Sequence, residues 1–238
     1  MQHRRSAFAL GRVAGTRGAA FVAPAALNCT AYSANGRDGT LASLTAPRRA
    51  NDFISLNAVL SAAPGTYIEQ VLADRDSTIE RWPAHVAQPL KVWIDSSSLC
   101  SGAQASFPEA VRTAFTTWGT AGIPLRFSFV PSSRDADIRV HWISHLDHKT
   151  GSTTWRTDRN GWLTVGDITL ATHISDGQSL DTRGMRAIAL HEVGHALGLS
   201  HSLDPKDIMA PLIRVDGLSL SDRNTIKLLY SFPAGPIH

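Results

Sequence analysis

Residues 191–201 read HEVGHALGLSH, a stretch that holds three histidines and one glutamate. On an α-helix, residues four apart share one face, so His191 and His195 can direct their ring nitrogens to a single ion. Gly198 lets the chain end the helix and turn through backbone angles that other residues disfavour, which brings His201 back towards that ion. Three protein ligands leave a fourth position for water, as in catalytic zinc sites, whereas structural zinc is usually closed by four ligands. The spacing therefore predicts a catalytic zinc site.

The continuation of this stretch separates it from a chance pattern. A lone HExxH arises by chance on many helices, but here the longer HExxHxxGxxH is followed by SLDPKDIMAP at residues 202–211. With these residues the sequence resembles the metzincin metalloproteases, in which a methionine-containing turn follows the third histidine. Serine directly after that histidine, then Asp-Pro, Ile-Met and a proline, is most similar to the matrixin (matrix metalloprotease-like) branch and its minimal bacterial members. A metal site retained without activity is the alternative.

The residue types also indicate a mechanism. Zinc lowers the pKa of a bound water from about 16 towards roughly 7, so a nearby carboxylate can take its proton at neutral pH. Glu192 is that general base by its position, and the protonated side chain can then act as general acid towards the leaving amine. The prediction is a zinc metalloendopeptidase, a hydrolase that cleaves peptide bonds with a zinc-activated water.

The resemblance implies roles for further residues near the histidines. Met209 is implied to pack beneath the histidines as structural support and not as a ligand, a role close to ordinary core packing. Gly198 is implied to support the same geometry through its turn. Pro211, Leu212 and Ile213 are implied to wall an apolar pocket for the substrate side chain just after the cut, in an extended segment that the proline favours.

Short segments of alternating apolar residues predict the strands of a sheet. They lie at 90–95, 125–130, 137–143 and 166–172. Residues 151–155 correspond in the resembled fold to the cleft-edge strand, whose backbone pairs with an extended substrate. The fold class that the resemblance implies is α+β: a metzincin-like (zincin) catalytic domain with a twisted mixed β-sheet, an active-site helix, a methionine turn and a C-terminal helix.

Three helices are predicted from capping signals and apolar spacing. Ser106 and Glu109 have the spacing of a capping box. The apolar face that follows it has spacings of three and four residues and comprises Val111, Ala114, Phe115 and Trp118. The metal helix is predicted to begin near Asp181 or Thr182. The last helix is predicted to open with a second capping box at residues 219–222 and to stack Ile226, Leu229 and Tyr230 on one face.

Three features of vertebrate matrixins are not matched. No Pro-Arg-Cys-Gly segment is present to cap the zinc, and Cys29 has different neighbours, so latency would need another device. His145 and Asp147 match a pair that holds structural zinc in matrixins, but the corresponding strand positions lack histidine; His173 is a conceivable substitute. The acidic calcium-binding run is replaced by residues 171–176. One catalytic Zn²⁺ is therefore expected, and a second, structural Zn²⁺ or a Ca²⁺ remains only an alternative.

Positive charge is concentrated near the N-terminus. Residues 1–50 carry seven arginines and one acidic residue, whereas residues 51–238 carry 16 basic and 19 acidic residues. The basic pI is thus a property of the leader and gives no argument for nucleic acid. Arginines up to Arg17 and the apolar run 19–27 are similar to an imperfect secretory signal. We therefore expect a secreted protein, extracellular or periplasmic; a disordered leader is the alternative.

These observations divide the chain into three predicted regions. Residues 1–28 form the signal or leader, 29–79 a linker and a short propeptide, and 80–238 the matrixin-like catalytic domain. Four apolar residues at helical spacing indicate a small helix in the propeptide: Tyr67, Ile68, Val71 and Leu72. Cys29 and Cys100 are too few for a disulfide framework; they pair with each other on export or stay free.

The expected partners are protein or peptide substrates, without nucleic acid. No apolar run is long enough to span a bilayer, and a monomer is expected. Two functions of other classes remain as alternatives. One is a catalytically inactive zinc-containing module that binds peptides, against which the intact Glu192 argues. The other is a structural or adhesive surface protein, against which the absence of sequence repeats argues.

Overall fold

The computed structural model describes residues 4–7, 64–96, 103–174 and 177–237. Most of the predicted leader and linker, together with Cys29 and Cys100, lies outside these residues, so the predictions made for them stay predictions. Within the described residues, no helix is both long and apolar enough to cross a membrane.

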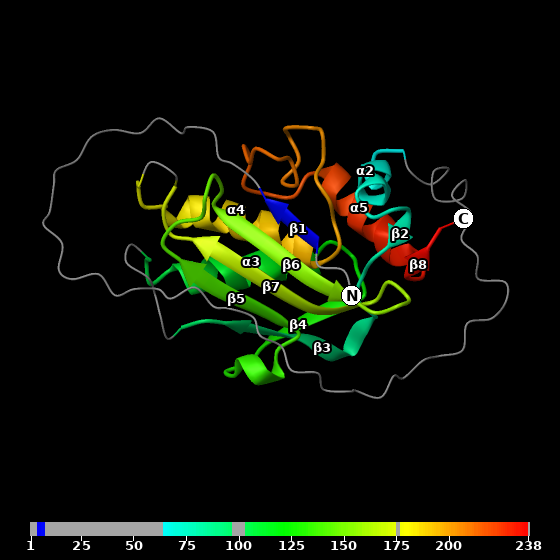
Figure 1. Cartoon of the computed structure of the whole chain (residues 1–238), viewed down its shortest axis with the longest axis horizontal. Coiled ribbons are helices and arrows are strands. Elements are labelled where there is room, and N and C mark those ends of the chain that lie inside the picture. Colours follow the sequence, from blue (N-terminus) through cyan, green and yellow to red (C-terminus); the bar gives the residue numbers. More distant parts are fainter. Residues whose placement is uncertain (1–3, 8–63, 97–102, 175–176, 238) are drawn as a thin grey trace, which may run out of the picture.

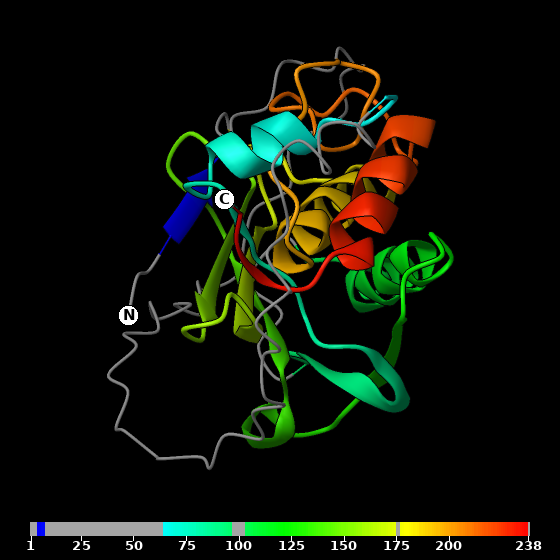
Figure 2. The same cartoon turned by 90° about the vertical axis from the view of Figure 1, so that its right-hand side faces the viewer.

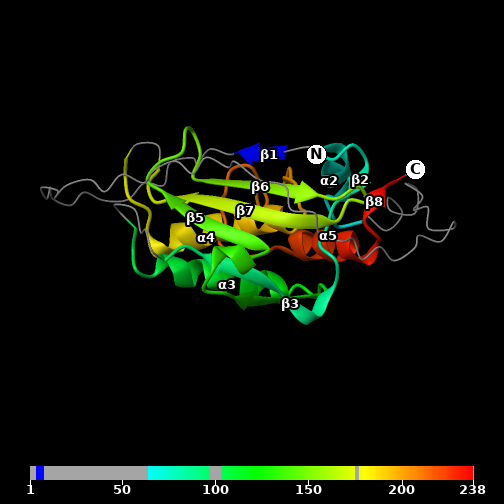
Figure 3. The same cartoon turned by 60° about the horizontal axis from the view of Figure 1, so that its bottom comes forward.

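A mixed six-stranded sheet forms the frame of the molecule (Figure 1). Its spatial order is β1-β6-β7-β5-β3-β4. The strands are β1 (Arg4–Ala7), β3 (His85–Ile94), β4 (Leu125–Phe129), β5 (Ile138–Ile143), β6 (Gly151–Thr157) and β7 (Leu163–Ala171). Strands β4, β3, β5 and β7 run parallel, while β6 is antiparallel to β7 and β1 is antiparallel to β6. Figure 3 shows this order from β1 at one edge to β3 near the other.

Helices α3 (Phe107–Gly119) and α4 (Thr182–Ala196) cover one face of the sheet. The described residues also form α2 (Ile68–Ala73) and α5 (Leu220–Ser231), which contact each other, and a 3₁₀ turn η1 (Ser133–Asp135) after β4. Figure 2 shows α3 and α4 on the same side of the sheet, with α5 beside α4. A small second sheet pairs β2 (Thr78–Ile79) with β8 (Gly235–Pro236), which brings the segment before β3 next to the segment after α5. The α+β architecture with a mixed sheet, a long helix that carries His191 and His195, and a C-terminal helix is as predicted.

The core lies between the sheet and the two long helices. In β5 the apolar residues Ile138, Val140 and Trp142 are buried, and the residues between them are half-exposed. The predicted apolar face of α3 is buried as well, and Trp118 on it donates its indole N–H to the carbonyl of Leu190 on α4 at 2.8 Å. This contact fixes α3 against the helix that carries two of the three predicted ligands.

The starts of α4 and α5 follow the predictions. Asp181 precedes α4 and its carboxylate accepts the backbone N–H of Gly184 at 2.6 Å. Ser219 precedes α5, and its side chain and that of Asp222 satisfy each other's backbone N–H groups in a full capping box. Local sequence therefore determines where these two helices begin.

The capping box predicted for Ser106 and Glu109 is wrong. Ser106 has helical backbone angles and its side chain makes no capping hydrogen bond. Its hydroxyl instead lies 2.7 Å from the hydroxyl of Thr182, next to the start of α4. A tertiary contact therefore replaces the local one.

We predict that Trp118→Ala lowers the free energy of unfolding of the metal-free protein by about 3–5 kcal/mol, because it leaves a cavity between α3 and α4. The exposed Thr116 on the other face of α3 provides the control, and Thr116→Ala should change stability by no more than about 0.5 kcal/mol. Urea unfolding followed by circular dichroism measures both. Equal effects of the two substitutions would show that the α3–α4 contact is not a main support of the fold.

Candidate metal centre

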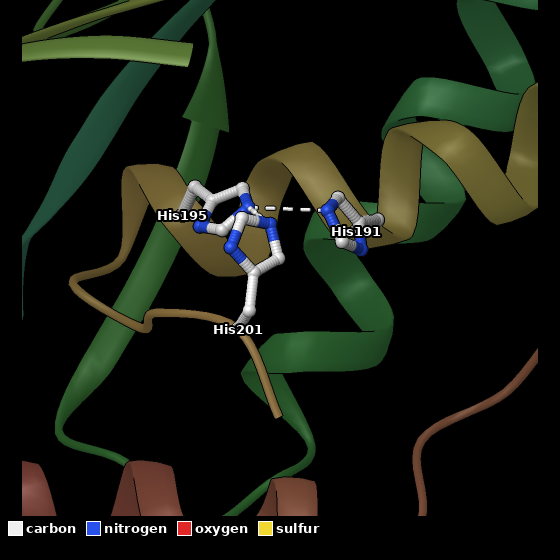
Figure 4. A group of neighbouring side chains, drawn as sticks. All are labelled: His191, His195 and His201. Carbon is white, nitrogen blue, oxygen red and sulfur yellow. Dashed lines mark hydrogen bonds between the residues drawn. The ribbon is translucent and has the colours of Figure 1, made fainter. Parts of the chain in front are cut away.

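Three histidine side chains converge at the C-terminal end of α4 (Figure 4). His191 and His195 project from successive turns of the helix, and His201 reaches them from the loop that follows. The Nε2 atom of His195 lies 3.1 Å from that of His191 and 3.0 Å from that of His201. The predicted ligand set is thus brought together, and it is the one group of three or more metal-ligating side chains found within the described part of the chain.

Gly198 makes the return of the chain possible. Its φ angle is +108°, in the region that side chains other than glycine's rarely allow. A Cβ atom at this position would lie 2.4 Å from the backbone oxygen of Glu80. Both the turn and the close approach therefore require glycine; the sequence predicted the turn, and the approach to Glu80 is seen only in the structure.

The hydrogen bonds of two histidines direct their lone pairs to one point. The Nδ1 atom of His191 lies 2.7 Å from the carbonyl oxygen of Ile208, and that of His195 lies 2.9 Å from the carbonyl oxygen of Leu199. Because a carbonyl only accepts, each Nδ1 must carry the proton, which leaves each neutral ring with a lone pair on Nε2. The contact drawn between these Nε2 atoms in Figure 4 therefore joins two acceptors, an arrangement that a bound cation would stabilise.

The geometry fits zinc. Tetrahedral coordination with Zn–N distances of 2.0–2.1 Å places two ligand nitrogens about 3.3 Å apart. The observed separations of 3.0 and 3.1 Å are close to this value. A carbonyl that accepts the second ring N–H is also the usual partner of a metal-ligating histidine.

Burial keeps the three imidazoles in the neutral form that binds metal. Removal from water lowers the pKa of His191 to about 4 and that of His201 to about 3. The pKa of His195 lies well below its ordinary value for the same reason, with a further contribution from its two histidine neighbours. A metal ion consequently meets little competition from protons near neutral pH.

Glu192 lies beside the histidines and is almost completely buried. The hydroxyl of Thr153 on β6 lies 2.7 Å from its Oε2 and 3.0 Å from its backbone oxygen. Gly151 on the same strand leaves room for the glutamate, because a Cβ there would lie 2.3 Å from Oε1. Burial raises the pKa of Glu192 to about 7, against the opposing effects of the Thr153 hydroxyl and the positive charge of Lys149.

Met209 packs against α4 at Gly194, the residue before His195, and its supporting role beneath the histidines stays a prediction. It is fully buried, and a Cβ added to Gly194 would lie 2.3 Å from its sulfur atom. The backbone oxygen of Met209 accepts the N–H of Ser202, the residue after the third histidine. The methionine turn thus packs against α4 and is also joined to the loop that carries His201.

For the remaining predicted site residues, the structure does not show the predicted role. Pro211, Leu212 and Ile213 are half-buried in the loop after Met209, and the apolar pocket predicted for them stays a prediction. The rings of His145 and His173 stack with centroids 4.7 Å apart. The two belong to no group of three metal-ligating side chains among the described residues, so the structure does not show a second ion there.

The neighbours of Glu192 were not predicted from the sequence. Gly151 carried a signal, because an isolated glycine within a strand pattern often marks a close approach of another group. Thr153 carried none, since threonine is common in strands. Its contact with Glu192 joins residues 39 apart in the chain.

Comparison with known proteins gives the same assignment for this region. The sequence pattern of the matrixin family, peptidase M10, matches residues 90–231. Human matrix metalloproteinase-15 is 34% identical over 148 residues, which cover 53% of this chain and 22% of that protein. Rat (Rattus norvegicus) matrix metalloproteinase-16 is 31% identical, covering 52% and 24%, and metalloendoproteinase 1 of soybean (Glycine max) is 29% identical, covering 52% and 46%. The chain spans less than half the length of these relatives.

We predict that the metal-free protein loses stability as the pH falls from about 6.5 towards 4. In this range the unfolded chain binds protons at the three histidines that the folded chain does not bind, since the pKa of His191 is lowered to about 4 and that of His201 to about 3. Glu192, with its pKa raised to about 7, acts in the opposite direction, because only the folded state holds its proton between pH 4.5 and 7. The three histidines together have a larger effect on the free energy of unfolding than the single glutamate, so stability falls with pH.

The urea midpoint of chelator-treated protein should therefore be lower at pH 5 than at pH 7. Glu192→Gln removes the opposing contribution and should steepen the loss, whereas His201→Asn should flatten it. A midpoint at pH 5 that equals or exceeds the one at pH 7 would contradict the assignment of buried, neutral imidazoles.

Proposed function

Because this chain belongs to the matrixin family, we propose that it is a zinc-dependent endopeptidase with Glu192 as its general base and acid. The observation that supports this most directly is the convergence of His191, His195 and His201 beside a buried glutamate that is not part of the ligand set. A closed structural zinc site would have a fourth protein ligand in place of an open position.

Zinc held by the three histidines would supply Lewis acidity, lowering the pKa of a water molecule and polarising a peptide carbonyl. The protein has to accept a proton from that water and return it to the leaving amine. Glu192 can do both, because burial holds its pKa at about 7 and it therefore exchanges protons near neutral pH. The nearby cationic centre would favour its ionised form when metal is bound.

Thr153 and Gly151 hold the glutamate in position for this role. The Thr153 hydroxyl bonds Oε2, and the missing side chain of Gly151 gives the other oxygen room beside β6. The carboxylate therefore has one oxygen fixed by the protein. A carboxylate that is already held in place needs little rearrangement when it accepts a proton.

We further propose that the substrate pairs with β6 as an added strand. In the structure β1 occupies this edge and pairs antiparallel with β6, with Arg4 opposite Trp155 and Ala7 opposite Ser152. The edge can thus accept an added strand, and a bound substrate would replace β1 there. A peptide in the same place would run past Glu192, which touches Gly151 at the start of the strand. Backbone hydrogen bonds of this kind read chain direction without requiring particular side chains.

We predict that Glu192→Gln lowers the rate of casein cleavage by about 10²–10⁴-fold, the usual contribution of a general base. Zinc content should remain at the wild-type value because the glutamate is not a ligand. Gel analysis of casein digestion and metal analysis of the same preparations test both parts. Loss of zinc from Glu192→Gln would refute the role given to the glutamate. Wild-type protein that holds zinc and cuts no substrate would favour the peptide-binding alternative.

We predict that His201→Ala weakens zinc binding more than the loss of a residue that only hydrogen-bonds a metal ligand. Such a loss typically weakens binding by about 10–100-fold. His201→Ala has the larger effect because two nitrogen ligands remain where three converged. Competition with a chromogenic chelator measures the change, and His85→Ala, which alters a histidine at the start of β3, provides the control. An unchanged affinity would mean that a different residue is the third ligand.

A further inference from the structure

Residues 64–80 precede the region that matches the matrixin family, yet they pack behind the metal centre. Helix α2 in this segment lies beside α5, and its residues Ile68, Val71 and Leu72 are buried. A helix was predicted here as part of a propeptide, and the helix is present. The residues that flank it, Tyr67 and Arg75, are however connected by hydrogen bonds to the partners of two of the three histidines.

We propose that Arg75 is a positioning residue of the metal centre, which holds the Leu199 carbonyl and thereby orients His195, and that residues 64–80 belong to the catalytic unit. This inference rests on the proposed function only in requiring that the three histidines bind a metal ion.

The guanidinium group of Arg75 is buried at the end of α4, with 1% of the residue exposed. Its Nη2 donates to the carbonyl oxygen of Leu199 at 3.4 Å, and the same oxygen accepts Nδ1–H of His195 at 2.9 Å. A carbonyl oxygen has two lone pairs and can accept both donors. The oxygen that fixes the ring of His195 is therefore itself held by Arg75.

Glu80 and Trp155 hold Arg75 in turn. Glu80 forms an ion pair with Nη1, and it also accepts the indole N–H of Trp155 at 3.0 Å. The guanidinium lies over the indole ring of Trp155, 4.5 Å from its centroid. A planar cation is thus fixed by a carboxylate and an aromatic face, contacts that a flexible ammonium group reproduces poorly.

Arg75 lies at the C-terminal end of α4, where its positive charge has a second stabilising effect. The last carbonyls of a helix lack intrahelical partners and carry partial negative charge, which a nearby cation stabilises. Trp82 donates to the carbonyl of Ala196 at 2.8 Å and Tyr230 to that of Leu197 at 3.0 Å. Arg75 places its positive charge beyond these two carbonyls, at the Leu199 carbonyl that also accepts from His195.

The other end of the segment reaches His191. The hydroxyl of Tyr67 donates to Oδ1 of Asp222 at 3.0 Å. The other oxygen of Asp222 accepts the N–H of Ile208 at 2.9 Å, and the carbonyl of Ile208 bonds Nδ1 of His191 at 2.7 Å. Both ends of residues 67–75 are therefore connected to residues whose carbonyls orient metal ligands. Removal of this segment as a propeptide would break both connections.

The test compares three variants of the full chain. Arg75→Met removes the charge and all donors, and Arg75→Lys keeps the charge without the planar fork. Val71→Ala on α2, the helix just before Arg75, removes buried apolar volume from a side chain that can form no hydrogen bond, so it controls for a general loss of stability. Zinc affinity is measured by chelator competition, and the visible spectrum of the Co²⁺-loaded protein reports the ligand geometry.

We expect Arg75→Met to weaken zinc binding by about tenfold, at the lower end of the effects of outer partners of metal ligands, and to alter the Co²⁺ spectrum. Arg75→Lys should recover part of the affinity. Val71→Ala should lower the melting temperature while leaving zinc affinity and the Co²⁺ spectrum as in the wild type. Wild-type affinity and spectrum in Arg75→Met would overturn the proposal.

Should Arg75→Met fail to fold, Arg75→Lys and Tyr67→Phe decide the question. Weakened zinc binding with a changed Co²⁺ spectrum in Arg75→Lys, accompanied by a smaller loss in Tyr67→Phe, would support the positioning role. Wild-type values in both would overturn it. Failure of the wild-type chain to bind zinc would instead refute the proposed function, so the two failures are distinguishable.

Discussion

Two carbonyl oxygens, those of Ile208 and Leu199, fix the tautomers of His191 and His195, and the metal centre depends on this constraint. Because each ring donates from Nδ1, both Nε2 lone pairs face the same point, where His201 also arrives. Buried lone pairs that face one another are unfavourable without a cation between them. The structure therefore favours metal binding before any particular substrate is considered.

The segment that carries the Ile208 carbonyl is held by residues at the start of α5. Asp222 opens α5 and at the same time bonds the backbone of Ile208. Asp207 accepts the hydroxyl groups of Ser202 and Ser219, which joins the loop after His201 to the start of α5. The hydrogen bonds that cap α5 and those that hold the metal centre thus form one network. A substitution that breaks the capping bonds should therefore also alter the position of the metal ligands.

The parts of the fold that the sequence predicted are those determined by local patterns. Alternating apolar residues placed β5, and the capping signal placed the start of α5, because period and capping act over a few residues. The three histidines were predictable for the same reason: helix geometry and one glycine bring them together within eleven residues. The capping box at Ser106 failed because the hydroxyl of a distant residue, Thr182, competed for the side chain.

The supporting residues could not be predicted because their partners are distant. Arg75 and Leu199 are 124 residues apart, and Tyr67 and Asp222 are 155 apart. No spacing rule connects such pairs. Nothing in the local sequence singled out Arg75, although it is among the most deeply buried side chains of the described residues. Composition likewise gave no indication that Trp155 would lie beneath it.

X-ray absorption at the zinc edge of the zinc-loaded full chain tests the central claim most directly, since it counts and identifies the atoms bound to the metal. We predict three imidazole nitrogens at about 2.0–2.1 Å and one non-protein oxygen, with no sulfur. The same spectrum should be obtained for Glu192→Gln. A fourth protein ligand, a sulfur atom at about 2.3 Å or only two imidazoles would contradict an open three-histidine centre served by a separate glutamate.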